Sequence, residues 1–157
     1  MSSPESSDPY GSEAKNFTTL TAHCLQKGLQ LGSVVGVAVV APVAMLLKYR
    51  AGKSVELSHL VKYQVYSLGF GVTVSLAMMM GKYVSWQNKR ECLRDRVYRI
   101  HHNSDQTRVD KITMGAFLAA GFVSFLATSK FVYSLGMTTP AVVGGLLYHV
   151  ATKKSKI

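Results

Sequence analysis

The chain has 157 residues, with 48% hydrophobic residues, 17% charged residues and a formal net charge of +10. This length is enough for a single domain. A strong positive charge can indicate nucleic-acid binding, but that function needs a folded basic surface. Here the Lys and Arg residues lie in blocks beside apolar stretches, where lipid headgroups would meet them, so we expect no nucleic-acid partner.

The N-terminal segment, residues 1–17, is polar and rich in Ser, with Glu5, Asp8 and Glu13. A secretory signal has a basic start followed by an apolar core, and an organellar transit peptide is rich in Arg and poor in acids. The segment fits neither pattern. We therefore expect a polar tail, and import into an organelle would have to use internal signals.

Long uncharged stretches dominate the rest of the chain. Residues 28–47, 63–81, 112–129 and 131–152 contain no Asp, Glu, Lys or Arg. About 20 apolar residues cross a hydrocarbon layer of ~30 Å, whereas helices of a soluble domain need a polar face. The sequence therefore predicts an all-α fold, an integral membrane bundle of about four transmembrane helices within residues 18–157.

The first two spans are separated by a short polar loop. The first, 28–47, contains Pro42, which should kink its last turn. The second, about 64–82, leads into a charged segment, 82–111, which we expect to continue it as a polar helical extension.

The last two spans are harder to separate. Asp110 is a candidate cap for the third span, about 112–135, and Gly136 is a candidate for its end. The fourth, about 139–153, would begin beside Pro140, because proline suits the first turn of a helix.

Small residues recur at four-residue spacing along each span. In lipid, helix contact depends on dispersion and close backbone approach, which small residues permit. The alternative is that glycine is simply common in membrane helices. We expect a compact bundle in which these glycines pack against neighbouring helices: Gly28, Gly32, Gly36, Gly69, Gly71, Gly81, Gly115, Gly144 and Gly145.

The titratable residues form no recognisable catalytic constellation. His101, His102 and Asp105 have no further ligand at a spacing typical of zinc sites, and His149 lies close to Lys153, which favours an interfacial position. A proton relay or ion-coupled transporter normally needs an acidic residue within a span, and the spans have none. We expect no enzyme activity, no metal and no cofactor.

Two cysteines flank the first helical pair. Cys24 precedes the first span and Cys92 follows the second, so antiparallel helices would place both on the same side of the membrane. They can form a disulfide in an oxidising compartment. Two free thiols are the alternative, since spacing does not establish the geometry of the bond.

The segment 82–111 combines eight basic and four acidic residues. Attraction to lipid needs no acids, whereas a protein partner uses both signs and favours Arg and aromatic anchors. We expect a docking surface made by Arg90, Arg94, Arg96 and Tyr98. A solvated extension held near anionic headgroups is the alternative.

Four short Gly-rich spans after a polar, acidic start resemble the Tim translocase family of the mitochondrial inner membrane. In that family a charged stretch leads through an Arg and an Asp into a Gly-Ala-rich third helix. The matching positions here are Arg108, Asp110, Gly115, Ala116 and Gly121. Some members also carry cysteines before the first helix and after the second, as Cys24 and Cys92 are placed here.

The resemblance points to one of two branches. Import members present polar or acidic groups to a lateral cavity, and the spans here lack acids. A branch with the same plan, the accessory membrane subunit of respiratory complex I, does no chemistry. The resemblance thus implies a non-catalytic subunit that stabilises NADH:ubiquinone oxidoreductase, with other membrane subunits and lipids such as cardiolipin as partners. A Tim-type protein-import component is the alternative.

The two indications of membrane orientation disagree. With both termini on one side, that side holds thirteen basic residues and the other side five. The positive-inside rule then places the termini in the matrix, whereas the resemblance and the cysteine pair place them in the intermembrane space. We expect the intermembrane space, because the rule describes proteins inserted by a translocon.

Overall fold

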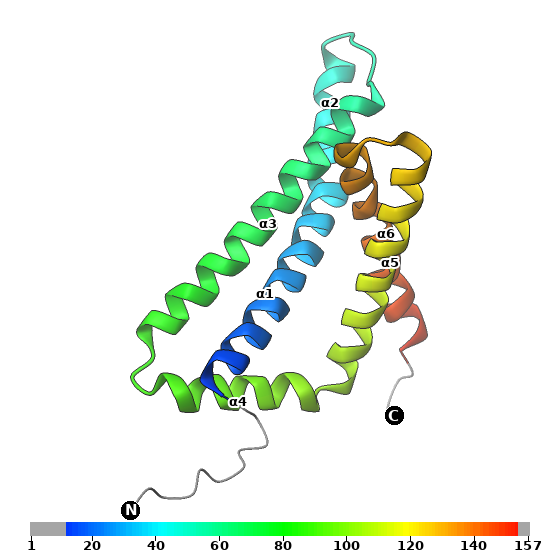
Figure 1. Cartoon of the computed structure of the whole chain (residues 1–157). Coiled ribbons are helices and arrows are strands. Elements are labelled where there is room, and N and C mark those ends of the chain that lie inside the picture. Colours follow the sequence, from blue (N-terminus) through cyan, green and yellow to red (C-terminus); the bar gives the residue numbers. More distant parts are fainter. Residues whose placement is uncertain (1–11, 154–157) are drawn as a thin grey trace, which may run out of the picture.

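The structure, a computed structural model, describes residues 12–153 (Figure 1). Their elements are α1 (Glu13–Val35), the π-helical segment η1 (Gly36–Val40), α2 (Ala41–Arg50), α3 (Leu57–Ser85), α4 (Lys89–His102), α5 (Ser104–Thr128) and α6 (Phe131–Thr152). Four helices, namely the continuous stretch Glu13–Arg50, α3, α5 and α6, are long and apolar enough to cross a membrane by length and composition. For the described residues, this confirms the prediction of an all-helical chain with four helices of spanning length. Residues 1–11 of the predicted tail lie outside the described residues.

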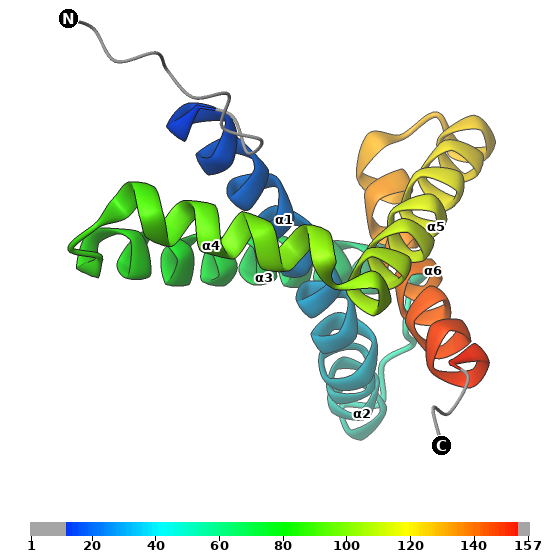
Figure 2. The ribbon, with the colours of Figure 1, turned by 90° about the horizontal axis from the view of Figure 1, so that it is seen from below.

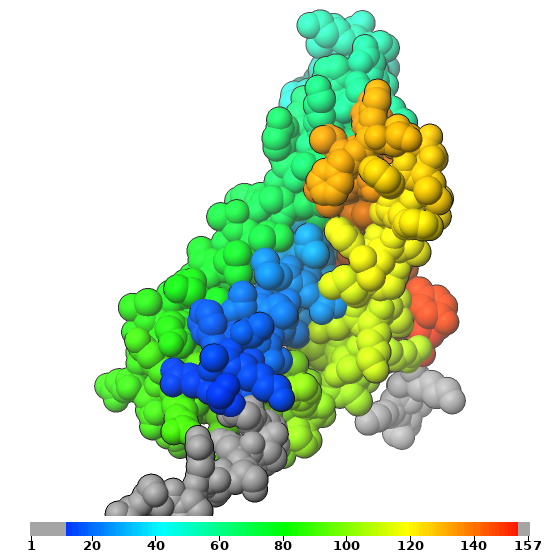
Figure 3. Space-filling view, in the orientation of Figure 1, coloured from blue at the N-terminus to red at the C-terminus, as the bar shows by residue number. Residues whose placement is uncertain are grey.

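The long helices pack as two neighbouring pairs. α1 runs along α3 and α5 runs along α6, while α6 also contacts α3 and α1. α4 lies across the end of the bundle where α1 begins and α6 ends, as the views from the side and from below show (Figures 1 and 2). In the space-filling view, α1 is visible between the surfaces of α3 and α5 (Figure 3).

α1 begins within the segment that was expected to be tail. Ser12 caps the helix, since its hydroxyl accepts a hydrogen bond from the Lys15 backbone N–H at 3.4 Å. Glu13 lies in the first turn, where the helix dipole favours a negative charge.

The predicted kink near Pro42 takes the form of a π-helical stretch. Pro42 has no N–H to donate to the preceding turn, and residues Gly36–Val40 just before it adopt the wider π-helical pattern. Gln64 of α3 donates a hydrogen bond from Nε2 to the Gly36 carbonyl at 3.1 Å. The first span is therefore one continuous helix with a local widening.

The charged segment is a separate helix and not an extension of α3. After α3 ends at Ser85, Asn88 caps α4 by accepting a hydrogen bond from the Glu91 N–H at 3.5 Å. Asn103 caps α5 in the same way, accepting from the Gln106 N–H at 3.1 Å. The prediction that Asp110 caps the third span was wrong, because the asparagine stops the preceding helix and starts α5 earlier.

The boundary between the last two helices also differs from the prediction. Ser129, not Gly136, ends α5; it adopts a left-handed conformation with φ 52°, and its N–H donates to the Phe125 carbonyl at 2.7 Å. Pro140 consequently lies inside α6. The Thr139 hydroxyl donates to the Gly136 carbonyl at 2.9 Å, and this is the acceptor that a proline at position 140 leaves without its usual backbone donor.

The interior is unusually rich in small polar side chains, whereas the outer faces are apolar. In α5, Leu118, Phe122 and Leu126 are more than 60% exposed. The buried polar residues include Ser33, Ser67, Thr113, Ser134, Thr138 and Thr139. This distribution is the reverse of the one found in a soluble protein.

Candidate functional site

Glycines bring α1 and α3 into backbone contact. A Cβ atom added at Gly32 would lie 2.5 Å from the Ser67 carbonyl oxygen, and one at Gly28 would lie 2.7 Å from the Cα of Val72. Gly71 faces Gly28 and Gly32 from the other side of the contact. Any side chain at these three positions would force the two helices apart.

Two further predicted packing glycines also face other helices. Gly36 lies against the Gln64 side chain, and a Cβ atom at Gly145 of α6 would lie 3.3 Å from the Cγ2 atom of Ile112 in α5. Gly136, which was expected to end a helix, instead packs inside α6 against Val61, with 2.8 Å from an added Cβ atom to the Val61 carbonyl oxygen.

The remaining predicted packing glycines do not touch another helix. Within the part of the chain that the structure describes, nothing lies within 4 Å of a Cβ atom added at Gly69, Gly81, Gly115 or Gly144. For these four the expected contact is absent inside the bundle. Four-residue spacing marks a face that is able to pack, but it does not indicate which face a neighbouring helix of the same chain will cover.

A polar cluster joins α1 to α5 near the end of the bundle that α4 covers. Its members are His23, Gln26, Lys27 and Gln30 on α1 and Gln106, Asp110 and Thr113 on α5. On each helix they recur every three or four residues, so each set occupies a single helix face.

The Asp110 carboxylate is the centre of the polar cluster. Its Oδ1 accepts hydrogen bonds from Lys27 Nζ at 2.6 Å and from Gln30 Nε2 at 3.0 Å. His23 Nδ1 lies 3.3 Å from Oδ2, and Gln30 also donates to Thr113 Oγ1 at 2.8 Å. The Asp110 side chain is only 14% exposed, so the carboxylate is largely removed from solvent.

Two amide side chains complete the polar cluster. Gln26 donates from Nε2 to the backbone carbonyl of Asp110 at 2.6 Å, and Gln106 Nε2 lies 2.7 Å from His23 Nε2. α1 and α5 have few other direct contacts. The polar cluster is therefore a clamp between the two helical pairs, and its carboxylate is fully engaged by protein donors.

Sequence reasoning missed the polar cluster because it treated Asp110 only as a cap and as a match to the Tim pattern. The available indication was the regular spacing of polar residues at positions 23, 26, 27 and 30 in the approach to an apolar span. Among residues 12–153, no three His, Cys, Asp or Glu side chains are grouped so that they could hold a metal ion.

The two cysteines are free, half-buried thiols in the structure. Cys24 lies on α1 and packs beside the buried side chains of Leu20, Met79 and Leu93. Cys92 lies on α4, which contacts α1. The expected placement at one end of the bundle is present, but the disulfide is not formed, and its formation in an oxidising compartment stays a prediction.

The four residues of the expected docking surface do not share one face. Arg90 and Arg94 are exposed on α4, and Tyr98 is 44% exposed. Arg96 instead points toward the bundle, with its guanidinium carbon 4.9 Å from the centre of the Trp86 ring. The reason is helical periodicity: Arg96 follows the buried residue Leu93 by three positions and so lies on the inner side.

His102 and Arg108 make contacts with nearby residues. His102 Nδ1 lies 2.9 Å from the Tyr98 carbonyl oxygen, and Arg108 donates to the Thr152 hydroxyl at 2.8 Å. His149, expected at an interface, is buried in α6, and its Nδ1 has no hydrogen-bond partner among residues 12–153.

The chain matches one family model, described as a protein of unknown function (DUF1757), over residues 15–150. The match includes the polar cluster, the contact between α1 and α3 and nearly all of α6. No curated protein matches the sequence. Since the family model covers most of the chain, this protein belongs to the DUF1757 family.

Proposed function

We propose that this chain is a non-catalytic, multi-pass subunit of a larger assembly in the mitochondrial inner membrane, and that it braces neighbouring subunits through helix packing. The observation that carries the proposal is the set of outward-facing glycines at positions 69, 81, 115 and 144. Glycine inside a helix costs about 0.5–1 kcal/mol relative to alanine. A close helix from another subunit compensates for that cost, whereas lipid does not.

The distribution of side chains supports insertion into a bilayer. The bundle exposes large apolar residues such as Phe122 and Val150 on its long helices, while serines and threonines fill its helix contacts. In water, a surface of this kind would drive aggregation. In lipid it is the surface expected of helices held together by close packing and hydrogen bonds.

The choice of assembly draws on the resemblance to the Tim-type four-helix family. Within that family plan, the accessory subunit of NADH:ubiquinone oxidoreductase fits best, because Asp110 is engaged by Lys27 and Gln30 and is not presented to a passing polypeptide. A protein-import component of the Tim type is the second candidate. In either assembly, the resemblance puts the end that carries α4 in the intermembrane space.

Purification of the tagged full-length protein in mild detergent tests the proposal. We expect it to migrate in native gels with respiratory complex I and to be detected there by mass spectrometry. Recovery as a free monomer alone would contradict an assembly role. Crosslinking to a stalled precursor, together with migration with a translocase, would support the import alternative and reject the respiratory one.

A pair of variants tests the glycine faces themselves. Gly115→Leu should lower the fraction of the protein found in the assembly without destabilising the isolated bundle, because nothing in the described chain opposes the new side chain. Ala127→Leu, an equally exposed position on another side of α5, is the matched control. Equal assembly of both variants would exclude the face at Gly115 as a contact.

A further inference from the structure

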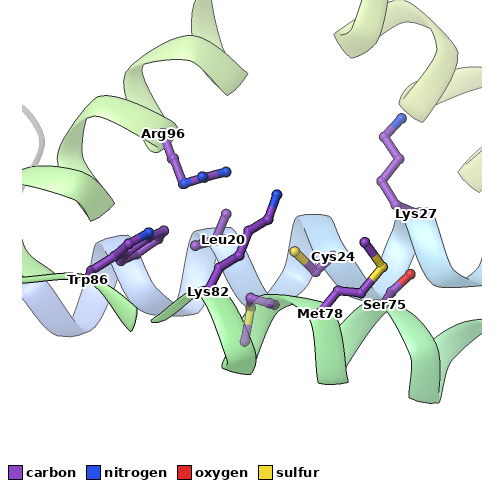
Figure 4. A pocket seen from close by; sticks show the side chains of 9 residues that line it. Leu20, Cys24, Lys27, Ser75, Met78, Lys82, Trp86 and Arg96 are labelled. Carbon is purple, nitrogen blue, oxygen red and sulfur yellow. The ribbon is translucent and has the colours of Figure 1, made fainter. Parts of the chain in front are cut away.

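A hollow of about 200 Å³ opens between α1, α3 and α4 (Figure 4). Its walls are largely apolar and include Leu20 of α1, Met78 and Met79 of α3, and Trp86 at the end of α3. Ser75 of α3 also lines it. The hollow is thus shaped by three elements that the fold brings together at one end of the bundle.

Two cationic side chains lie at the rim of this hollow. Figure 4 shows the Lys82 ammonium and the Arg96 guanidinium directed to the same side, and no carboxylate among the described residues lines the hollow. Lys27 also contributes to the lining, but its ammonium is 2.6 Å from Asp110 Oδ1 and points away from the other two. The rim therefore carries two positive charges for which the hollow supplies no acidic partner.

Arg96 and Lys82 are both held beside Trp86, at the end of α3. Arg96 is held over the Trp86 ring at 4.9 Å, a cation–π arrangement that orients the guanidinium. Lys82 lies in the last turn of α3, and Trp86 caps that helix. The end of an apolar span with a tryptophan and a lysine is the level at which a bilayer presents its headgroups.

We propose that this hollow binds an anionic phospholipid, with the phosphate between Lys82 and Arg96 and the start of an acyl chain along Leu20 and Met78. Basic pockets between membrane helices recognise anionic headgroups in this way. A zwitterionic lipid would bring a cationic group beside two cations, and a small soluble anion would leave the apolar walls uncovered. The inference requires the chain to lie in a bilayer, but it does not depend on any partner subunit.

Trp86 supplies the measurement, because it is the chain's single tryptophan. The full-length protein is reconstituted in phosphatidylcholine vesicles in which a fixed fraction of lipid carries bromine near the headgroup end of one acyl chain. In one set of vesicles the brominated lipid is phosphatidylglycerol, and in the other it is phosphatidylcholine. We expect phosphatidylglycerol to be preferred about fivefold or more at the quenching site, since one basic residue near an anionic surface contributes about that factor, and high salt should reduce the preference.

Two variants separate the hollow from general surface charge. In Lys82→Gln with Arg96→Gln, the preference for phosphatidylglycerol should fall below twofold. The control, Lys15→Gln with Arg90→Gln, removes two exposed charges from the same end of the bundle without touching the hollow, and should keep the preference. Each preference is a ratio of two lipids measured on one variant, so a change in the intrinsic Trp86 fluorescence does not enter it.

A third variant keeps every charge. Ser75→Leu should fill the hollow and lower the preference below twofold, with helicity unchanged by circular dichroism. Equal quenching of the wild-type protein by the two brominated lipids would overturn the proposal, as would an equal loss in the control pair. If the Lys82 and Arg96 variant does not fold, the wild-type and Ser75→Leu measurements still show whether the hollow binds the anionic lipid.

Discussion

Lys27 Nζ lies 2.6 Å from Asp110 Oδ1, so an ion pair joins two helices whose paired residues are 83 positions apart in the sequence. Lys27 belongs to the pair formed by α1 and α3, and Asp110 belongs to the pair formed by α5 and α6. The contact therefore holds the two halves of the bundle together at the end where α4 lies.

Removal of Asp110 should destabilise the protein more than simultaneous removal of both charges. Breaking a buried pair costs about 3–5 kcal/mol. The Lys27 side chain is 33% exposed, and solvent screening reduces such interactions, so we expect about 2 kcal/mol for Asp110→Leu. The double variant Lys27→Met with Asp110→Leu should recover part of this loss. The free energy of unfolding in mixed micelles measures both, and strict additivity of the two single changes would contradict a direct pair.

Substitution by alanine should lower the stability of the protein at Gly32 and raise it at Gly69, both in the pair formed by α1 and α3. Gly32→Ala places a Cβ atom 2.5 Å from the Ser67 carbonyl oxygen, and overpacking of this kind costs about 1–3 kcal/mol. Gly69→Ala, in an open position on α3, should stabilise the helix by up to about 1 kcal/mol. Thermal unfolding of the isolated protein distinguishes them. A stable Gly32→Ala protein would mean that α1 and α3 do not meet at this face.

The Thr139 hydroxyl should contribute to the free energy of unfolding because Pro140, which follows it, has no N–H to donate. Thr139→Val removes the hydroxyl that donates to the Gly136 carbonyl at 2.9 Å, and we expect a loss of about 1 kcal/mol, the usual net contribution of an intramolecular hydrogen bond. In a Pro140→Ala background the backbone N–H takes over as donor, so the same substitution should cost less. Unfolding free energies of the four proteins form a double-mutant cycle, in which zero coupling would refute the compensation.

Charge reversal on α4 should be confined to Arg90 and Arg94, which are exposed, and should omit Arg96, which faces the bundle. If α4 docks on a partner, Arg90→Glu with Arg94→Glu weakens association about tenfold or more, because like charges then face each other across the contact. Arg50→Glu with Lys53→Glu, at the opposite end of the bundle, is the control. Undiminished co-purification of the Arg90 and Arg94 variant would leave contact with headgroups as the role of this surface.

The number of long helices was predictable from the sequence, because charge-free stretches of about 20 residues have few alternatives to a spanning helix. Helix ends were less accessible. Gly136 and Pro140 have the residue types of a helix end and a helix start, yet both lie inside α6. Contact with Val61 and the Thr139 hydroxyl offsets their local preferences, and such tertiary compensation has no trace in the local sequence.

The candidate sites required knowledge of which helices are neighbours. Lys27 and Asp110 each resembled a flanking charge at the end of an apolar stretch, and only the packing of α1 beside α5 turns them into a pair. The same holds for Arg96, whose sequence neighbours on α4 gave no indication that it faces Trp86. Periodicity defined the faces of each helix, but their partners depend on the topology of the whole bundle.

The clamp between Lys27 and Asp110 also bears on the order in which the protein is built. α1 with α3, and α5 with α6, form two helical hairpins, and within each hairpin the two helices contact each other more than they contact the other hairpin. Until they meet, Lys27 and Asp110, which lie beside the ends of the apolar stretches, each lack their ion-pair partner. Union of the hairpins neutralises both charges in one step. A chain interrupted after the first hairpin would therefore leave Lys27 without the carboxylate that α5 supplies.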